Sequence, residues 1–215
     1  MTVAVKICGL STPDSIVQAV AGGADYVGFV FYRPSPRNLT PDQARPLAAL
    51  VPEGVKKVAL TVDADDALLA AIVAAIAPDY IQCHGRETPE RIAAIRARFA
   101  IPVIKAIKLR ERADLAQAEA YDGVADMLLF DALAPDEAAG ALPGGNGMPF
   151  DWTLLAGRQP TVPWMLSGGL DPDNVATAVQ VTAAAIVDVS SGVESLPGIK
   201  DDQKIRRFLS VAKAL

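Results

Sequence analysis

Two residues whose side chains can exchange protons stand at the ends of apolar runs, far apart in the sequence. Cys8 ends the run Val3–Cys8, Gly9 follows it at once, and Ser11 or Thr12 stands where the N-cap of a helix is expected. A thiol titrates near ~8.5, and a helix N-terminus or a nearby cation lowers that pKa. Cys8 is therefore a candidate nucleophile or general base, with a cysteine that only fills space as the alternative interpretation.

The second residue is Asp131, which directly follows the apolar stretch "DMLLF". Desolvation at the end of a strand favours the neutral form of a carboxyl group and suits it to donate a proton, although an aspartate that caps a loop has the same setting. A base and an acid that face each other across an anchored sugar phosphate are arranged for an aldose–ketose isomerisation. The long segment 132–150 predicts a lid, with hinges at Gly140, Gly144, Gly145 and Gly147.

Two segments rich in glycine and serine predict a binding site for a phosphate group. The stretch "LSGGLDPDNV" contains Ser167–Gly169, and "VDVSSGVE" contains Ser190–Gly192. Glycine lets backbone N–H groups approach an anion closely, and the N-terminus of a following helix adds a favourable field. Ordinary turns are the alternative for either segment alone. Two such segments after consecutive predicted strands favour the phosphate site.

Other polar residues near predicted strand ends are candidates for binding. Arg33 and Arg37 lie among prolines in "RPSPRNLT", and a guanidinium group suits a carboxylate or an aromatic ring, with a solvated arginine as the alternative. Asp63 is expected to cap a helix. His84, the only histidine, is expected either to form hydrogen bonds at the site or to be structural. One histidine and two cysteines from separate strands lack the spacing of metal ligands, so no metal is expected.

The elements that must position these residues alternate between strands and helices. Short β-branched runs predict strands at Val3–Cys8, Tyr26–Phe31, Lys57–Val62, Tyr80–Gln82, Val103–Ile107, Asp126–Phe130, Pro163–Leu166 and Ala185–Val189. Helical patterns lie near Pro13–Ala21, Pro41–Leu50, Asp66–Ile76, Pro89–Arg98, Arg110–Tyr121, Trp152–Leu155, Pro172–Gln180 and Asp201–Lys213. A capping side chain directly before proline marks the expected start of four of these helices, at Thr12, Thr40, Thr88 and Asp171.

This alternation predicts an α/β protein in which residues 1–215 form one domain, a single (β/α)8 barrel (a TIM barrel) of parallel strands. A doubly wound open sheet is the competing architecture. Active sites of such barrels lie on the loops after the strands. Because Cys8, Asp131 and both glycine-rich segments follow predicted strands, we expect them at one rim of the barrel.

Composition narrows the class of partner. The 215 residues carry a formal net charge of −5 and are 51% apolar, which favours a globular protein and argues against a nucleic-acid surface. No apolar run reaches the ~18 residues of a membrane span, and no secretory signal is recognised. A cytoplasmic protein with free thiols and a small-molecule substrate is expected, without a membrane partner, as a monomer or a homodimer.

Short stretches between residues 5 and 201 occur in an order that is typical of one enzyme family. They are "VKICGL", "GADYVGFVF", "SPR", "IQCHG", "LLFDAL", "GGNG", "FDW", "LSGGLDPDNV", "VDVSSGVE" and "GIKD". With them the sequence resembles the phosphoribosylanthranilate isomerases of tryptophan biosynthesis. The resemblance implies an Amadori rearrangement of N-(5-phosphoribosyl)anthranilate to 1-(2-carboxyphenylamino)-1-deoxyribulose 5-phosphate, a phosphorylated substrate, and no metal or organic cofactor.

The resemblance also implies roles for single residues. Asp131 matches the general acid that protonates the furanose ring oxygen, and Cys8 matches the general base that removes the C2′ proton. Arg37 matches the arginine that contacts the anthranilate part. The other matches are the substrate-binding positions Gln82, His84 and Asp188 and the phosphate-binding positions Gly168, Gly169, Ser191 and Gly192.

Three positions depart from the family pattern. Cys83 replaces leucine in Q-L-H-G, Ala132 replaces threonine after Asp131, and Asn146 replaces threonine or serine in the glycine-rich stretch. None of these changes removes a proton-transfer residue.

Three alternatives differ in the residues that they need. The isomerase of histidine biosynthesis runs the same chemistry with paired aspartates, one of them where Cys8 stands here. Indole-glycerol-phosphate synthase needs a catalytic lysine at a strand end, for which Lys108 is a poor match. A non-catalytic barrel that binds a sugar phosphate needs neither Cys8 nor Asp131.

Overall fold

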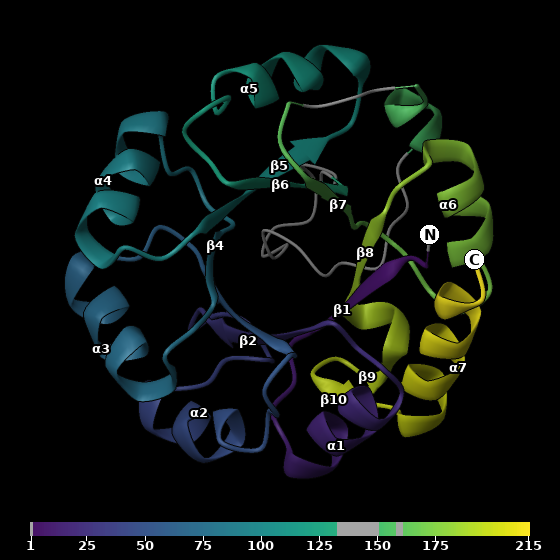
Figure 1. Cartoon of the computed structure of the whole chain (residues 1–215), viewed down its shortest axis with the longest axis horizontal. Helices are drawn as coiled ribbons and strands as arrows, with labels where there is room; N and C mark the ends of the chain where they lie inside the picture. The colour runs from purple at the N-terminus through teal and green to yellow at the C-terminus, as the bar shows by residue number, and fades with distance from the viewer. Residues whose placement is uncertain (1, 133–150, 158–160) are drawn as a thin grey trace.

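In the computed structural model, which describes residues 2–132, 151–157 and 161–215, eight parallel strands close into a barrel. The strands follow one another in sequence order and β8 pairs with β1, while the helices form an outer ring (Figure 1). The barrel strands are β1 (Ala4–Cys8), β2 (Tyr26–Phe31), β3 (Lys56–Thr61), β4 (Tyr80–Cys83), β5 (Val103–Leu109), β6 (Met127–Ala132), β7 (Trp164–Leu166) and β8 (Ile186–Val189). The predicted (β/α)8 barrel is confirmed, and the open sheet is wrong.

The helices begin largely where the sequence places their caps. Thr12, Thr40 and Thr88 each accept a hydrogen bond from a backbone N–H at the start of α1, α2 and α4, and proline takes the first turn. The α-helices are α1 (Pro13–Ala21), α2 (Pro41–Ala48), α3 (Asp66–Ile76), α4 (Pro89–Phe99), α5 (Ala116–Glu119), α6 (Val175–Thr182) and α7 (Asp202–Lys213). The 3₁₀ helices are η1 (Arg112–Leu115), η2 (Trp152–Leu155) and η3 (Ser191–Val193).

The predicted start of α6 at Pro172 is wrong. The Asp171 carboxylate accepts hydrogen bonds from the backbone N–H groups of Asp173 at 2.7 Å and Asn174 at 3.0 Å. These bonds form a turn in place of the first helical turn, and α6 begins at Val175. An aspartate before proline stabilises either structure, and here the turn is the one formed.

Asp63 is not a helix cap, contrary to the prediction. Asp65 caps α3 and accepts from the N–H of Leu68 at 2.8 Å. Asp63 Oδ1 instead accepts from the backbone N–H of Arg86 at 2.6 Å, which ties the loop after β3 to the loop after β4.

Two further segments differ from the prediction. The helix expected over Arg110–Tyr121 is divided into η1 and the short α5. A small antiparallel hairpin of β9 (Glu194–Leu196) and β10 (Ile199–Lys200) follows η3 and was not predicted. Strands of two or three residues carry too little alternation to be recognised in a sequence.

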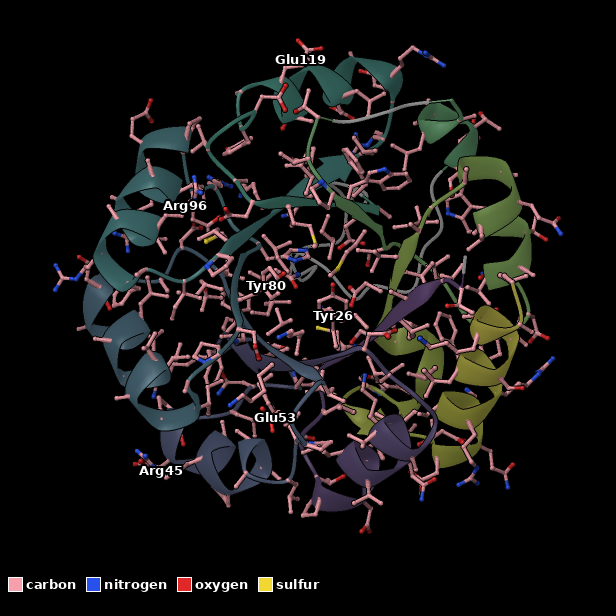
Figure 2. All side chains as sticks on the ribbon, viewed as in Figure 1. Tyr26, Arg45, Glu53, Tyr80, Arg96 and Glu119 are labelled. Atoms are coloured by element: carbon pink, nitrogen blue, oxygen red, sulfur yellow. The ribbon has the colours of Figure 1, made fainter. Side chains whose placement is uncertain are left out.

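The barrel interior changes from apolar to polar along its axis. Tyr26 and Tyr80 stand inside the ring of strands with their ring centroids 6.0 Å apart, whereas Arg45 and Glu119 lie on the outside (Figure 2). Around the tyrosines the interior is filled by Val58, Ile104, Ala106, Met127, Leu129, Met165 and Ile186. Alternate strand residues share a face, so the same inward rows continue to the C-terminal strand ends with Lys6, Cys8, Gln82, Lys108, Asp131 and Asp188.

A larger apolar cluster fills the layer between strands and helices, with Phe29, Phe130 and Phe208 among its fully buried members. This layer fixes the strands that carry the polar rim. In the described part of the chain, no helix is both long and apolar enough to cross a membrane.

Candidate active site

Cys8 lies on the inner face of β1 at its C-terminal end, with only 3% of its surface exposed. Gly28 on β2 is its register partner, and a Cβ atom on Gly28 would stand 2.9 Å from Cys8 Sγ. The absence of a side chain at Gly28 therefore creates the space that the thiol occupies. Burial raises the pKa of Cys8 above its ordinary value, while the ammonium groups of Lys6 and Lys200 act in the opposite direction.

Lys6 forms a buried ion pair directly below Cys8. Its side chain is fully buried, and its Nζ lies 2.8 Å from Asp188 Oδ1 on the neighbouring strand β8. Ser167 after β7 donates from Oγ to Asp188 Oδ2 at 3.1 Å. Asp188, predicted to bind substrate, is therefore held between two side chains of the protein. Sequence reasoning missed Lys6, although a lysine inside an apolar run two residues before Cys8 is a recognisable signal.

Asp131 ends the inward row of β6 and is joined to two of the predicted site residues. Its Oδ2 lies 3.1 Å from His84 Nε2, and His84 Nδ1 lies 2.9 Å from Gln82 Nε2. All three side chains are buried. The backbone N–H of Ala132 donates to Asp131 Oδ1 at 2.9 Å. Although Ala132 replaces the threonine of the family pattern, its main chain still holds the carboxyl group of Asp131.

Lys108 on β5 is the register partner of Asp131, and its side chain is half-buried. Burial lowers the pKa of Lys108, and the carboxylate of Asp131 counteracts that effect. Asp131 thus has His84 and Lys108 as neighbours.

A second buried ion pair holds the loop that carries His84. Lys105 Nζ lies 2.8 Å from Glu87 Oε2 and donates to the carbonyl of Gly85 at the same distance. Glu87 also accepts from the backbone N–H of Asp63 at 2.9 Å. This pair faces away from the barrel axis, since Lys105 alternates with the inward Ile104 and Ala106.

Arg37 is buried and forms a bidentate pair with Glu194. Its Nε lies 2.7 Å from Oε1 and its Nη2 lies 2.8 Å from Oε2. Lys200 Nζ lies 2.8 Å from the same Oε1 and also donates to the carbonyl of Ser190. Although burial alone raises the pKa of Glu194, Arg37 and Lys200 hold it below its ordinary value. Sequence reasoning missed Glu194 and Lys200; both stand in the quoted stretches "VDVSSGVE" and "GIKD", but their distance from Arg37 in the sequence gives no sign of contact.

The two glycine-rich loops lie against each other at the same end of the barrel. Gly168 and Gly169 have φ angles of +86° and +68°, which favour glycine. A Cβ atom on Gly192 would stand 1.9 Å from the carbonyl oxygen of Leu170, so the loop after β8 packs directly on the loop after β7. Within the described residues, no acceptor takes a hydrogen bond from the N–H of Gly168 or Gly169. These donors suit an anion.

Other predicted features have different outcomes. Arg33 is exposed. Cys8 and Cys83 are free thiols, as predicted, and burial raises the pKa of Cys83 to about 12. Among the residues that the structure describes, no group of three or more histidine, cysteine, aspartate or glutamate side chains is placed to hold a metal ion. The predicted lid, except Ala132, and the Asn146 departure lie outside the described residues.

A closed parallel barrel with a thiol, a carboxylic acid and adjoining glycine-rich loops at the C-terminal strand ends belongs to the class of (β/α)8-barrel enzymes that act on phosphorylated small molecules. Residues 5–211 match the model of the N-(5′-phosphoribosyl)anthranilate isomerase family. The chain belongs to this family, as the sequence motifs predicted.

Similar proteins support this membership over the whole chain. The N-(5′-phosphoribosyl)anthranilate isomerase of Rhodospirillum centenum is 56% identical, with 100% of both chains covered. The crystal structure of phosphoribosyl anthranilate isomerase from Thermotoga maritima is 35% identical, with 99% and 100% of the two chains covered and a TM-score of 0.88. That protein is described as dimeric in a further structure. A phosphoribosyl anthranilate isomerase in complex with reduced 1-(o-carboxyphenylamino)-1-deoxyribulose 5-phosphate is 34% identical, covers 99% and 100%, and has a TM-score of 0.84.

Proposed function

We propose that the chain converts N-(5′-phosphoribosyl)anthranilate into 1-(2-carboxyphenylamino)-1-deoxyribulose 5-phosphate, with Asp131 as general acid and Cys8 as general base. Membership in the family supports the substrate and the reaction. The observation that carries the residue roles is that both side chains point inward at the C-terminal end of the barrel, where the two glycine-rich loops also lie.

The first step opens the sugar ring. Asp131 gives its proton to the ring oxygen, the C1′–O bond breaks, and the lone pair on the anthranilate nitrogen forms the C1′=N bond of a protonated Schiff base. The bond between His84 Nε2 and Asp131 Oδ2, at 3.1 Å, fixes the direction of the carboxyl group. A fixed acid loses little orientational freedom when the reaction begins.

The second step moves the proton at C2′. The Cys8 thiolate removes it, the electron pair of the C–H bond forms the C1′=C2′ bond, and the nitrogen takes the electrons of the C=N bond. The resulting neutral enolamine gains a proton at C1′ and loses the proton of its C2′ hydroxyl group. This yields the ketone, and the reactant and product contain the same atoms.

The remaining site residues bind and orient the substrate in this proposal. Arg37 contacts the anthranilate part, and its bidentate pair with Glu194 fixes the plane of its guanidinium group. The phosphate lies on Gly168, Gly169, Ser191 and Gly192, and Gln82, His84 and Asp188 lie beside the sugar. A cytoplasmic location and the choice between monomer and homodimer stay predictions.

The experiment offers the purified protein two substrates. N-(5′-phosphoribosyl)anthranilate, generated in situ, is expected to lose its fluorescence rapidly, with the ketone product identified by NMR. The aminoaldose of the histidine pathway is the comparison substrate. We expect its turnover to be far slower, because the isomerases of that pathway have an aspartate at the position of Cys8. No fluorescence loss with folded protein would contradict the proposed function.

A further inference from the structure

The buried ion pair of Lys6 and Asp188 stands directly beside the proposed base. Lys6 and Cys8 are two residues apart on β1, so their side chains point to the same side, into the barrel. Lys6 and Asp188 are register partners on neighbouring strands, with Nζ 2.8 Å from Oδ1. Cys8 acts to raise the pKa of Lys6, and Lys6 in turn acts to lower the pKa of Cys8.

Stability alone does not account for this pair. Removing two charges from water is costly, and apolar side chains of similar volume often replace a buried ion pair without loss of stability. Lys6 has no exposed surface, and Asp188 is 4% exposed. An ammonium group has three donors, so Lys6 can bind Asp188 and still face the sulfur atom.

We propose that Lys6 is the counter-charge of the Cys8 thiolate and that Asp188, itself fixed by Ser167, holds the ammonium group in that place. This inference rests on the proposed role of Cys8 as the base. Lys6 is accordingly a positioning residue that acts through Cys8, and Asp188 is a positioning residue that acts through Lys6.

The charges around Cys8 have opposite effects on its pKa. Burial raises that pKa most strongly; Lys6 on β1 and Lys200 on β10 lower it, and Asp188 on β8 raises it. The facing position on β2 is Gly28, which carries no charge. Burial by itself lowers the pKa of Lys6, but Asp188 and Cys8 outweigh burial, so the pKa of Lys6 lies above its ordinary value and the group stays an ammonium ion.

The test measures the Cys8 thiol directly, in a Cys83→Ala background that leaves one thiol in the chain. Thiolate absorbance near ~240 nm and the rate of alkylation by iodoacetamide are followed against pH. We expect Lys6→Met to raise the pKa of Cys8, which lowers the alkylation rate about tenfold or more at mildly alkaline pH. Asp188→Asn, which is nearly isosteric, is expected to lower the pKa and to increase that rate.

Controls separate this role from a structural one. The double variant Lys6→Met with Asp188→Asn is expected to lie between the two single variants. Lys105→Met removes a buried lysine pair that faces away from the barrel axis, with Glu87, and is expected to leave the Cys8 titration unchanged. The rising limb of kcat/KM against pH is expected to move to higher pH in Lys6→Met and to lower pH in Asp188→Asn.

Shifts in the same direction in both single variants, or no shift in either, would overturn the inference. If Lys6→Met does not fold, Lys6→Gln takes its place, and a Cys8 pKa that stays unchanged in Lys6→Gln would overturn the inference. These titrations need no turnover. Failure of the inference is therefore distinct from failure of the proposed function, which the substrate assay tests.

Discussion

The imidazole group of His84 lies against the carboxyl group of Asp131, with 3.1 Å between Nε2 and Oδ2. Gln82 faces the other ring nitrogen, with its Nε2 2.9 Å from Nδ1, and the three buried side chains form a chain that ends on the proposed acid. With the amide NH2 toward Nδ1, the histidine carries its proton on Nε2 and donates it to Asp131. Gln82 Oε1 is buried and has no partner in the part of the chain that the structure describes.

This row of three side chains predicts that Gln82 and His84 affect turnover through Asp131. We expect His84→Ala and Gln82→Leu each to lower kcat by about tenfold, because the acid loses its fixed direction. The double variant is expected to lose little more than either single variant, since both remove the same support. Steady-state kinetics of the four proteins test this. Additive losses, or a change in KM alone, would contradict this role and leave substrate binding as the only function of Gln82 and His84.

Gly28 is predicted to be required for the position of the base. A Cβ atom in Gly28→Ala would stand 2.9 Å from Cys8 Sγ and 3.1 Å from Cys8 Cα, so the thiol must move. We expect kcat to fall about 100-fold, as small displacements of catalytic groups do, with a loss of unfolding free energy of about 1–3 kcal/mol. Kinetics and urea unfolding measure both effects. A folded variant with the kcat of the parent would show that the position of Cys8 is unimportant.

The glycine-rich loops are predicted to bind the phosphate group through their backbone. Gly168→Ala places a side chain at a φ of +86°, and we expect KM to rise about tenfold while kcat changes little. Inhibition by inorganic phosphate is expected to weaken in parallel. Gly54→Ala is the matched control, because its φ is +97° and no atom lies within 4 Å of the added Cβ. If KM rises equally in Gly54→Ala, backbone strain and not the loss of a phosphate contact explains the effect of Gly168→Ala.

The pair of Arg37 and Glu194 predicts a pH-dependent stability. Because Arg37 and Lys200 hold the pKa of Glu194 below its ordinary value, the pair adds stability above the unfolded-chain pKa of ~4.3. That stability is lost as the pH falls through the lower pKa of the folded protein. Glu194→Gln removes the carboxylate that the buried Arg37 and Lys200 share, and we expect the free energy of unfolding to fall by about 3–5 kcal/mol at pH 7, with a smaller loss on acidification.

Urea unfolding at neutral pH and near pH ~3 checks this prediction. Asp42→Asn, which removes the exposed partner of Arg45, is the control and is expected to cost less than ~1 kcal/mol. Equal effects of the two substitutions at neutral pH would mean that the buried pair contributes no more than a surface pair.

The sequence predicted the barrel because its local signals agree with one another. Thr12, Thr40 and Thr88 cap helices as their position before proline predicts, and every predicted barrel strand is present to within two residues at each end. The same kind of signal failed at Asp171, where a turn competes with the helix for the same side chain.

The partners within the site could not be predicted in the same way. Lys6 meets Asp188 across 182 residues of sequence, and Arg37 meets Glu194 across 157. Parallel strands are buried on both faces and lack the alternation that would show which side chains point into the barrel. The positions Cys8, Asp131 and His84 could be named from motifs, whereas the contact of Lys6 with Asp188 depends on the pairing of β1 with β8 that closes the barrel.

The central claim is that Cys8 and Asp131 are the two proton carriers, and one comparison tests it most directly. The loss of fluorescence of N-(5′-phosphoribosyl)anthranilate is followed with the wild-type protein, Cys8→Ser and Asp131→Asn, while calorimetry checks that each variant still binds the product. We predict that kcat falls by at least about 100-fold in each variant, with product binding retained. A variant that binds the product and turns over at nearly the wild-type rate would contradict the role given to that residue.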